Sequence, residues 1–573
     1  MDNAQIAAVF QDIADLLEIK GENKFKIRAY QRAIQAIESL PQELEQMMAD
    51  GEDLKEIPGV GDAIAGKISE LVQTGKLQYY EDLKAQLPPG ITALLEIPGV
   101  GPRTAHKLGQ IGISNIDQLE KAIQGGSLHE MLRLGDKTLQ NILHEIQDIR
   151  RKDRRIPIGE ALPLVDAIFH ALSDIVGVRN LTTAGSLRRF RDTAGDIDLM
   201  GTADNAAAVI DAFVALPLVK QVLAQGTTKA SVIMKNGLQA DLRMVEQNSF
   251  GALLQYFTGS KQHNILLRTK AQKRGLSLNE YGITDTTTNM LEKFSTEEDF
   301  YHRLGLQYIP PEIREGQGEI ELAERNMIPH LVEMRDVKGD LHIHSNWSDG
   351  RDSIESLAMS ARDMGYEFIC ITDHSAGLGI AHGLNTERLA AQIEEIKLLN
   401  HKLQGMRVLS GIEVDIHADG SLDLPPEILS KLDIVTAAIH SGMREDEEQM
   451  TRRVIKALEN PLVHVLAHPT CRVIGSREPV ALDMEALFRA ALQHNKALEI
   501  NANPSRLDLK DIHIQRAREL GVKLTLGTDA HGAEQLRFMR FGVGTARRGW
   551  CQGKHLLNSW RLPEILKFLS GRK

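Results

Sequence analysis

The sequence has few cysteines, no long hydrophobic run and no excess of positive charge. Its three cysteines, Cys370, Cys471 and Cys551, are odd in number and widely separated, which argues against a disulfide framework and favours a reducing compartment. No apolar stretch approaches the roughly 20 residues of a membrane-spanning helix, and the start Met1-Asp2-Asn3 does not resemble a signal peptide. We therefore expect a cytoplasmic protein without membrane contacts. Because the net charge is -11, any contact with nucleic acid must depend on local basic patches.

The chain is too long for a single hydrophobic core. At a usual size of about 100 to 200 residues per domain, its 573 residues predict about three to five domains. The hydrophobic share of 42% and the charged share of 25% are those of an ordinary globular protein. Composition therefore indicates a globular class and leaves the function open.

A phosphate-binding turn is predicted at Gly185-Ser186, where an apolar run that begins at Leu181 ends. Backbone N–H groups and a hydroxyl at such a turn can hold a phosphate. Arg188 and Arg189 follow and add two guanidinium groups of the kind that bind phosphate oxygens. This segment therefore predicts half of a triphosphate site.

Two carboxylates follow this turn at the spacing of a β-strand. Asp196 and Asp198 would point to one face of the strand, while Ile197 and Leu199 face the core. A pair of hard carboxylates suits Mg²⁺ or Mn²⁺. A surface Asp pair on a polar sheet edge is the alternative, and the neighbouring phosphate turn favours the metal site.

A third carboxylate is predicted in a β-hairpin. Residues 230–245 alternate in polarity around Asn236-Gly237, which is a strong hairpin signal, and Asp241 falls in mid-strand. Because a lone Asp there needs a partner, we expect it beside Asp196 and Asp198. Three carboxylates can hold two metals about 3.5 to 4 Å apart, one activating a 3′-hydroxyl and one neutralising departing pyrophosphate. Asp241 is then also the candidate general base.

Two near copies of one segment lie in the N-terminal third. Gly59-Val60-Gly61 and Gly99-Val100-Gly101 each follow Glu-Ile-Pro and precede a helical pattern with a lysine, Lys67 or Lys107. This is the pattern of helix-hairpin-helix motifs, which grip the sugar-phosphate backbone without reading its sequence. The alternative is a tight turn between packed helices. Residues 134–138 are either a third copy or an unrelated turn.

Lys67 has two alternative roles. One turn into its helix, it can neutralise a phosphate; with a pKa lowered by burial or by Lys26, it could form a Schiff base with an abasic sugar. Residues 150–155, Arg-Arg-Lys-Asp-Arg-Arg, read as a basic connector between two DNA-directed segments. A merely solvated run of charges is the alternative.

The order of these motifs resembles that of family X DNA polymerases. It comprises both hairpin motifs, Gly-Ser-x-Arg-Arg, Gly-Asp-Ile-Asp, Asp-Leu-Arg at 241–243 and Tyr-Phe-Thr-Gly-Ser at 256–260. The resemblance implies triphosphate contacts from Ser186 and Arg189, metal ligation by Asp196, Asp198 and Asp241, sugar packing by Tyr256 and Phe257, a base contact from Asn264 and a template contact from Arg268. Packing in the thumb core is the alternative for Tyr256 and Phe257. Lys67 matches the family's lyase lysine, but Ala63 stands where polymerase beta has another lysine, which leaves lyase activity open.

From residue 337 onward, apolar runs repeatedly end in metal-binding side chains. Seven such runs, each followed by a helical pattern, predict a closed α/β barrel with its chemistry at the C-terminal ends of the strands. The side chains at these ends are His342 and His344, Asp373 and His374, Glu413, His440, His468, Asn501, and Asp529 and His531, with Asp349 in the first loop. Each histidine alone would be unremarkable, but together they predict a site for three metals.

The spacings His342-x-His344, Asp373-His374 and Asp529-x-His531 resemble the polymerase and histidinol phosphatase (PHP) superfamily. The implied ligand sets are His342, His344, Glu413 and Asp529 for one metal, Glu413, His440 and His468 for a second, and Asp349, His374 and His531 for a third. Such mixed ligands suit Mn²⁺ or Zn²⁺, and a bridging Glu413 would hold two ions around a hydroxide that hydrolyses a phosphoester. Arg444, Arg472 and Arg506 either grip substrate phosphates or serve as ordinary structural residues.

These observations predict a multidomain α/β protein. We expect a helical DNA-binding domain at 1–85, a fingers-like domain with the second hairpin motif at 86–155, a nucleotidyltransferase palm (α+β) at 156–245, a thumb at 246–313, a linker at 314–336 and a PHP (β/α)7 barrel at 337–573. A charged helix is expected at 312–333. The segments 309–316 and 545–550 also look like those of bacterial family X polymerases with a fused PHP domain, so the resemblance covers essentially the whole chain.

The resemblance implies a DNA repair enzyme that is associated with the nucleoid. It would add dNTP substrates to 3′ ends in gapped or nicked double-stranded DNA, with a 3′ to 5′ exonuclease and an abasic-site endonuclease in the PHP domain, and we expect a monomer. One alternative is a nucleotidyltransferase for RNA or a small molecule, fused to a histidinol-phosphate-like phosphatase. Another is a DNA-binding scaffold with inactive sites. Binding of gapped DNA and the metal content of the barrel distinguish these alternatives.

Overall fold

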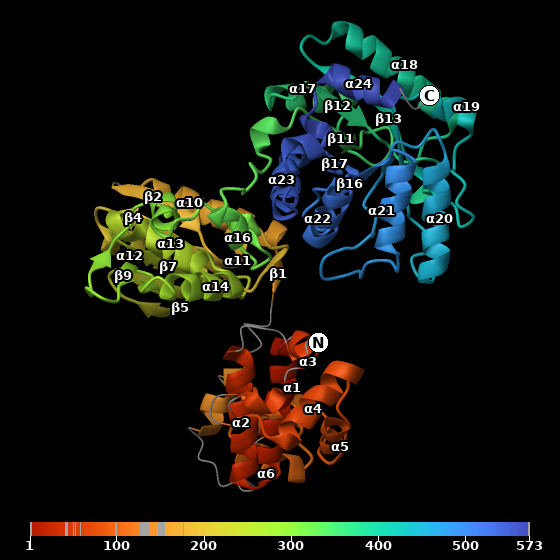
Figure 1. Cartoon of the computed structure of the whole chain (residues 1–573). Helices are drawn as coiled ribbons and strands as arrows, with labels where there is room; N and C mark the ends of the chain where they lie inside the picture. Colours follow the sequence, from red (N-terminus) through yellow and green to blue (C-terminus); the bar gives the residue numbers. More distant parts are fainter. Residues whose placement is uncertain are drawn as a thin grey trace. The chain divides into compact units, whose positions relative to one another are not determined.

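The chain divides into two compact units, Met1–Arg154 and Arg155–Lys573, in the computed structural model (Figure 1). The structure describes residues 3–39, 44–49, 51, 53–57, 59–97, 100–125, 128, 138–143, 145–146, 155–175 and 177–570. None of the helices in these ranges is long and apolar enough to cross a membrane.

Among the described residues of the first unit, all the regular elements are helices. Its elements are α1 Asn3–Ile19, α2 Lys24–Ser39, α3 Leu44–Ala49, η1 Leu54–Glu56, α4 Asp62–Thr74, α5 Gln78–Ala85, η2 Ile91–Glu96, α6 Pro102–Gln110 and α7 Ile116–Gln124. Apolar residues at helical spacing form a first core, in which the rings of Phe10 and Tyr30 meet edge to face. Ile19, at the end of α1, belongs to a second core beneath α6 and α7. The two hairpin motifs therefore rest on two small helical cores.

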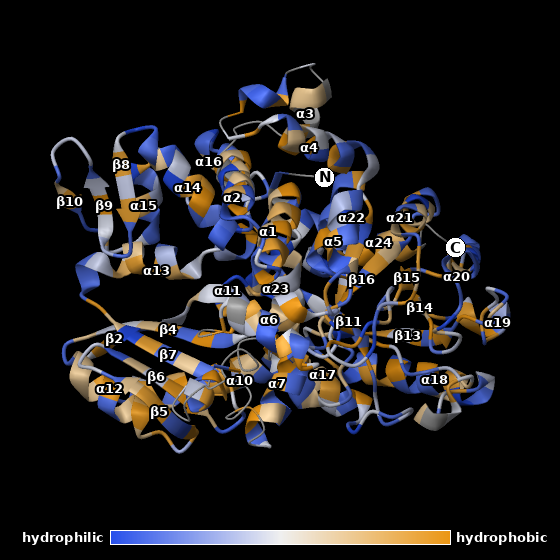
Figure 2. Cartoon of the chain, turned by 90° about the horizontal axis from the view of Figure 1, so that it is seen from below, coloured by the Kyte–Doolittle hydropathy of each residue, from blue (hydrophilic) through white to orange (hydrophobic). Residues whose placement is uncertain are grey.

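The second unit begins with a mixed five-stranded sheet in the order β2-β4-β7-β6-β5. Its elements are β1 Ile156–Pro157, α10 Ile158–Ser173, β2 Val178–Thr183, α11 Gly185–Arg188, β3 Thr193–Ala194, β4 Asp196–Ala203, α12 Ala206–Val214, β5 Val219–Gln225, β6 Lys229–Met234 and β7 Gln239–Met244. The strands β6 and β7 form the expected hairpin, in which Gly237 has a φ of 88°. Helices α10 and α12 cover one face of the sheet (Figure 2), so functional side chains must project from the other.

The thumb region combines helices with a three-stranded sheet. Its elements are η3 Gln247–Ser249, α13 Phe250–Thr258, α14 Lys261–Gln272, β8 Leu276–Asn279, β9 Gly282–Asp285, β10 Leu291–Glu292, α15 Glu297–Arg303, η4 Pro311–Ile313, α16 Glu319–Glu324 and η5 Met334–Asp336. The prediction of one charged helix over 312–333 is wrong, because the α-helix in this segment, α16, covers only Glu319–Glu324. Gly316 and Gly318 have φ values of 76° and 93°, a left-handed conformation that interrupts a helix.

Seven parallel strands, in sequence order from β11 to β17, form the C-terminal part, with helices outside them (Figure 1). The elements are β11 Gly339–Ile343, α17 Ile354–Asp363, β12 Phe368–Ile371, η6 Gly379–Ala381, α18 Thr386–Lys402, β13 Arg407–Asp415, α19 Pro426–Leu429, β14 Ile434–Ala438, α20 Glu447–Glu459, β15 Val465–Leu466, α21 Met484–Gln493, β16 Ala497–Asn501, α22 Asp511–Leu520, β17 Lys523–Gly527, η7 Ala533–Phe538, α23 Met539–Arg548, η8 Gly553–His555, η9 Leu557–Ser559 and α24 Leu562–Ser570. A parallel bridge between Ile343 and Ala530 brings β11 to the segment that follows β17. The predicted barrel is thus confirmed as a nearly closed one.

Candidate active sites

Three carboxylates lie on one face of the palm sheet. Along β4, Asp196 and Asp198 alternate with Ile197 and Leu199, whose side chains belong to the core under α10 and α12. Asp241 stands opposite Asp198 in the parallel pairing of β4 with β7. The three carboxylates singled out from the sequence therefore lie together.

Two residues that sequence reasoning missed hold Asp241. The hydroxyl of Ser231 donates a hydrogen bond to Oδ1, and Nε2 of Gln239 donates one to Oδ2 at 2.9 Å. Ser231 is directly opposite Asp241 on β6, so counting cross-strand pairs outward from the Asn236-Gly237 turn could have found it. These two bonds fix the orientation of the carboxylate.

Burial and neighbouring carboxylates raise the pKa of Asp198 and of Asp196. Burial, followed by the charges of Asp196 and Asp241, raises the pKa of Asp198 to about 7. Burial and the charge of Asp241 also raise the pKa of Asp196. A divalent cation would offset this repulsion, and carboxylate oxygens are ligands that Mg²⁺ and Mn²⁺ prefer. The cluster therefore fits a divalent metal ion.

The predicted phosphate turn lies directly against these carboxylates. Gly185 begins α11 with a φ of 56°, and a β-carbon on it would lie 2.5 Å from Oδ2 of Asp198. The N–H of Ala184 donates to the carbonyl of Asp198 at 2.8 Å, and half-buried Ser186 follows in the same turn. Because only glycine permits this close approach, a phosphate held here would lie beside the metal site.

The side chains of Arg188 and Arg189 reach into the thumb. Arg188 donates to the hydroxyl of Thr258 at 2.7 Å and to both carboxylate oxygens of Glu297. Arg189 donates to the carbonyl of Thr258 and to Glu315 at 3.3 Å. Both guanidinium groups therefore link palm and thumb, and a contact between Arg189 and a triphosphate stays a prediction.

The thumb residues expected at the nucleotide make two cation–π contacts. Arg268 lies 5.2 Å from the ring centroid of Tyr256, and Arg243 lies 4.4 Å from that of Phe257. Asn264 donates to the carbonyl of Tyr256 at 2.8 Å. Each aromatic ring is half-buried with a guanidinium beside it. The contacts of these residues with sugar, base and template stay predictions.

Glu413 lies at the centre of the barrel site. Its fully buried carboxylate has ring nitrogens of five histidines within 3.7 Å, namely those of His374 and His468 at 2.9 Å, His440 at 3.4 Å, His342 at 3.6 Å and His344 at 3.7 Å. These residues come from the C-terminal ends of five successive strands or the loops that follow them. The curvature of the barrel brings them to one place.

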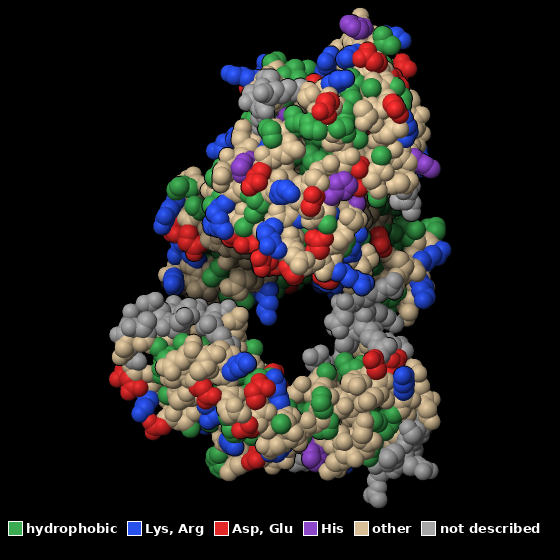
Figure 3. All heavy atoms as spheres, turned by 90° about the vertical axis from the view of Figure 1, so that its right-hand side faces the viewer, with side chains coloured by type: hydrophobic (Ala, Val, Ile, Leu, Met, Phe, Trp, Pro, Cys, Tyr) green, Lys and Arg blue, Asp and Glu red, His purple; other side chains and the backbone are tan. Residues whose placement is uncertain are grey.

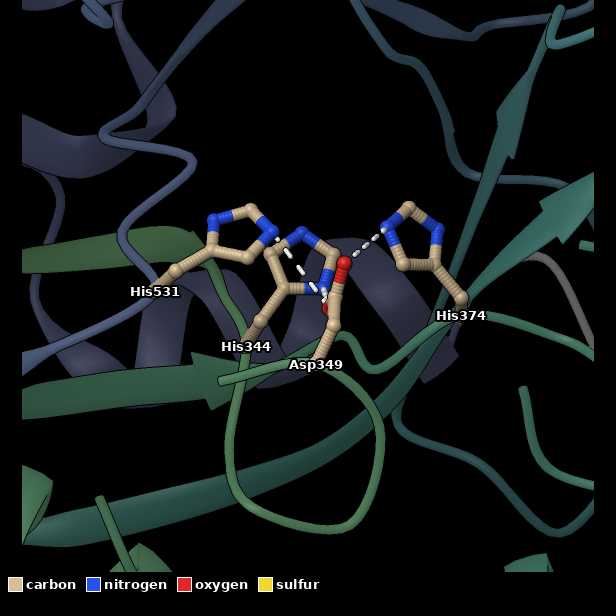
Figure 4. A group of neighbouring side chains, drawn as sticks. All are labelled: His344, Asp349, His374 and His531. Atoms are coloured by element: carbon tan, nitrogen blue, oxygen red, sulfur yellow. Dashed lines mark ion pairs between the residues drawn. The ribbon is translucent and has the colours of Figure 1, made fainter. Parts of the chain in front are cut away.

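A second cluster surrounds Asp349 in the loop after β11 (Figure 4). Its carboxylate oxygens lie 3.4 Å from Nε2 of His531, 3.7 Å from Nε2 of His374 and 3.9 Å from Nδ1 of His344. The ring of His374 thus faces Asp349 with one nitrogen and Glu413 with the other. This ring connects the two clusters.

The nine predicted ligands converge, but they group differently from the implied sets. Atoms close enough to share one ion belong to His344, Asp349, His374 and His531, to His342, His344 and Asp529, and to His374, Glu413 and His440. The structure thus adds His344 to the Asp349 group and His374 to the Glu413 group. The assignment of individual residues to individual ions stays a prediction.

Two acidic residues that were not predicted orient these ligands. The carboxylate of Glu499 lies 2.6 Å from the ring atom Nδ1 of His342. It also accepts a hydrogen bond from the backbone N–H of His468 at 2.7 Å. Asp415 lies 2.5 Å from Nδ1 of His440. Such partners fix the ring that a metal ion binds. Asp415 is two residues from a predicted ligand on the same strand, and this spacing could have revealed it.

Charge and burial in the barrel suit metal ions. Burial, followed by the charge of His374, lowers the pKa of His344 to about 3. Burial would raise the pKa of Glu413, but His374 and His440 hold it well below its usual value. Burial would lower the pKa of His440, but the charge of Glu413 raises it to about 10. A divalent cation would displace that proton, because neutral imidazole and ionised carboxylate are the forms that bind metals. Nδ1 of His344 is buried without a hydrogen-bond partner among the described residues, so a divalent cation fits the site.

The three arginines suggested for phosphate binding differ in their surroundings. Arg506 lies 3.4 Å from Asp529, and its Nη1 is buried without a hydrogen-bond partner among the described residues. Arg472 instead pairs with Asp192 of the palm at 3.1 Å, and Arg444 is exposed. Arg506 is therefore the best placed to hold a phosphate in the barrel.

In both hairpin motifs, a glycine lies at the position from which the following helix begins. Gly61 is the N-cap of α4, Gly101 is the N-cap of α6, and Gly59 has a φ of 90°. Gly99 lies outside the described residues, as do residues 129–137 and 150–154, which hold most of the third copy and of the basic connector. In the two motifs, N–H groups at the start of each helix are available to an anion.

The two motif lysines differ in exposure. Lys107 is exposed, whereas Nζ of Lys67 lies 4.8 Å from the ring centroid of Tyr79, beside Lys26. Burial, followed by the charge of Lys26, lowers the pKa of Lys67. On the face that Figure 3 shows, basic and acidic side chains are interspersed.

Family models match several parts of the chain. A helix-hairpin-helix domain matches residues 1–77, a SAM-like helix-hairpin-helix tandem matches 91–148, a DNA polymerase beta thumb matches 253–315 and a PHP domain matches 340–503.

Similar proteins fall into two groups. A DNA polymerase/3′-5′ exonuclease PolX of Bacillus subtilis (strain 168) is 38% identical over 572 residues, which cover 99% of this chain and 99% of that protein. A probable phosphatase of Thermoanaerobacter sp. (strain X514) is 34% identical over 204 residues, which cover 34% of this chain and 78% of that protein. A probable phosphatase of Caldanaerobacter subterraneus is 33% identical over 205 residues, again 34% of this chain and 75% of that protein. Only the first similarity extends over both units.

Proposed function

Because this chain belongs to the bacterial family X DNA polymerases that carry a PHP domain, we propose that it adds deoxynucleotides to DNA 3′ ends at the palm and removes nucleotides from 3′ ends at the barrel. The observation that carries this proposal is the similarity to a DNA polymerase/3′-5′ exonuclease over 99% of the chain. The separate carboxylate and histidine clusters of the second unit support it, because each reaction needs its own metal site.

At the palm, Asp196, Asp198 and Asp241 would hold Mg²⁺ or Mn²⁺. Ions bound there would supply Lewis acidity for a 3′-hydroxyl and offset the charge of pyrophosphate. Asp241, oriented by Ser231 and Gln239, is the base that accepts the proton of the hydroxyl. The turn at Gly185-Ser186 offers N–H groups to the triphosphate.

At the barrel, the nine ligands would hold three ions, either Mn²⁺ or Zn²⁺. Ions bound there would lower the pKa of water and offset the negative charge of a phosphodiester. His374 belongs to two of the ligand clusters, because one of its ring nitrogens faces Glu413 and the other faces Asp349. Arg506 binds a phosphate oxygen with its free Nη1. An abasic-site endonuclease reaction would use the same groups.

The hairpin motifs would hold gapped or nicked DNA for both reactions, with the protein acting as a monomer. Lys67 and Lys107 neutralise backbone phosphates in this proposal. The lowered pKa of Lys67 also suits Schiff-base chemistry on an abasic sugar, and reductive trapping with borohydride on a 5′-deoxyribose phosphate end would detect it.

A gapped duplex with a 5′-phosphate tests the proposal, incubated with and without nucleotides, in Mg²⁺ and in Mn²⁺. The double variant Asp196→Ala/Asp198→Ala should lose primer extension and retain 3′ resection, whereas His374→Ala should retain extension and lose resection. Asp174→Ala, an exposed position of the same palm, is the matched control for the first variant. Extension by the Asp double variant would contradict the metal assignment at the palm.

The nucleotidyltransferase alternative predicts a different acceptor. Presented with equal amounts of gapped DNA and of the same gap in RNA, this chain should extend the DNA. Preferential extension of RNA, or turnover of a small phosphomonoester without resection of DNA, would favour the alternative. Metal analysis that finds the barrel empty in the purified protein would favour the inactive scaffold.

A further inference from the structure

The palm and the barrel domain share one hydrophobic core within the second unit. Leu507 and Phe541, from the barrel domain, belong to the same buried cluster as Ile197 of β4. We call the contacts of residues 189–192 with Arg472, Leu507 and α23 the seam. The seam begins at Arg189, the C-cap of α11, and α11 itself begins with the proposed nucleotide turn.

Phe190 is the apolar part of the seam. It has a φ of 58°, and its ring lies against α23, where a β-carbon on Gly544 would be 2.2 Å from Cε1 of Phe190. The ring centroid of Phe541 is 6.2 Å away. Gly544 of α23 thus leaves space for the ring of Phe190, which a larger residue at this position would occupy.

Arg548, the last residue of α23, is the polar part of the seam. It is 8% exposed and donates from Nη1 to the carbonyl of Arg189 at 2.7 Å and to Glu315 of the thumb region at 2.9 Å. Its Nε and Nη2 both bind Asp511, at the start of α22. One guanidinium therefore joins the palm, the thumb region and the barrel domain, and the planar fork of arginine is what allows it.

The seam continues at Asp192, which accepts a hydrogen bond from Arg472 at 3.1 Å. Arg472 also donates to the carbonyl of Leu507, and it lies in the loop that carries the metal ligand His468. Residues 185–192 are therefore held at one end by Asp198 and at the other by the barrel domain.

We propose that Arg548 is a positioning residue for nucleotide addition: from within the phosphoesterase domain, it holds the backbone of α11 so that the turn at Gly185-Ser186 meets the incoming triphosphate. The inference rests on the proposed polymerase function and deepens it. Arg548 touches the carbonyl of Arg189 and no barrel ligand is among its partners, so its effect is directed at the palm. Displacement of a phosphate-binding backbone weakens binding of the nucleotide before it slows chemistry on bound nucleotide.

Three variants test this inference in the full-length protein. Arg548→Lys keeps the charge but loses the planar fork that reaches the palm, the thumb region and the barrel domain at once. Gly544→Ala pushes Phe190 without changing any charge. Arg540→Ala is the matched control, because Arg540 lies on the same helix and pairs with Asp166 of the palm at an exposed place away from the turn. Primer extension on gapped DNA gives KM and kcat for the nucleotide. The rate of 3′ resection without nucleotides measures the activity of the barrel, and the melting temperature measures the stability of the fold.

We expect Arg548→Lys and Gly544→Ala to raise KM for the nucleotide about tenfold or more with a smaller change in kcat, and to leave resection at the wild-type rate. Arg540→Ala should leave KM unchanged. Wild-type KM in both test variants would overturn the inference while the proposed function stands. A parallel loss of extension, resection and melting temperature would also overturn it, because the seam would then only hold the domains together. If the wild-type protein adds no nucleotide, both the inference and the proposed function fail.

Discussion

A β-carbon on Gly185 would lie 2.5 Å from Oδ2 of Asp198, so the proposed nucleotide turn is in direct contact with one of the proposed metal ligands. The φ of 56° at Gly185 adds a conformational reason for glycine. The two halves of the palm site therefore cannot shift independently.

Gly185→Ala should reduce nucleotide addition at least about tenfold, because the methyl group displaces Asp198 and the left-handed backbone costs about 1 to 3 kcal/mol. Primer extension measures the effect. Gly226→Ala is the matched palm control, since its β-carbon would lie 3.6 Å from the nearest atom, the carbonyl oxygen of Lys229. Normal extension by Gly185→Ala would mean that the turn is not the nucleotide site.

Asp198→Asn should stabilise the metal-free protein in a pH-dependent way. The folded-state pKa of about 7 exceeds the ordinary value of 3.8, so the folded protein retains a proton that the unfolded chain releases. This contribution to stability is complete below about pH 4 and is lost as the pH rises toward 7. In EDTA, the substitution should therefore raise the melting temperature more at pH 8 than at pH 5.

Asp174→Asn, at the exposed end of α10, is the control for this pH series. It should shift the melting temperature equally at both pH values. An equal shift for Asp198→Asn would show that repulsion among the palm carboxylates is not relieved by the substitution. Excess Mg²⁺ should reverse the advantage of the Asp198→Asn variant over the wild type, because the carboxylate binds the ion better than the amide that replaces it.

Asp415→Ala should lower 3′ resection about 10- to 100-fold, because His440 loses the partner that orients its ring toward Glu413. Metal analysis should find fewer ions in the barrel, and addition of Mn²⁺ should restore part of the activity. Primer extension is the internal control and should stay unchanged. Full resection at limiting metal would show that His440 needs no orientation by Asp415.

Lys67→Ala should weaken binding of gapped DNA and reduce the slope of log K against log salt by about 0.9, as expected for one lost phosphate contact. Lys76→Ala, at an exposed position between α4 and α5, should change neither. Fluorescence anisotropy across a salt series measures both quantities. An unchanged slope for Lys67→Ala would place the lysine away from the phosphates.

Features of short range were predictable because their causes lie within a few residues. The Asn236-Gly237 turn sets the register of its hairpin, and this register places Asp241 in a strand. Six of the seven barrel strands are recognisable by an apolar run followed by a predicted metal ligand, so the fold of the C-terminal part followed from repetition. The prediction of a helix at 312–333 was wrong because Gly316 and Gly318 adopt a left-handed backbone conformation, which interrupts a helix whatever the charge of the flanking residues.

The sequence by itself determined which side chains are available to each site, since ligand pairs such as Asp196 and Asp198 or His342 and His344 share a strand or its end. Only the tertiary structure decided what these residues face. Arg188 meets Glu297, and Arg548 meets the carbonyl of Arg189, across more than a hundred residues of chain. Local periodicity carries no information about such partners, because they are chosen when separate elements pack against one another.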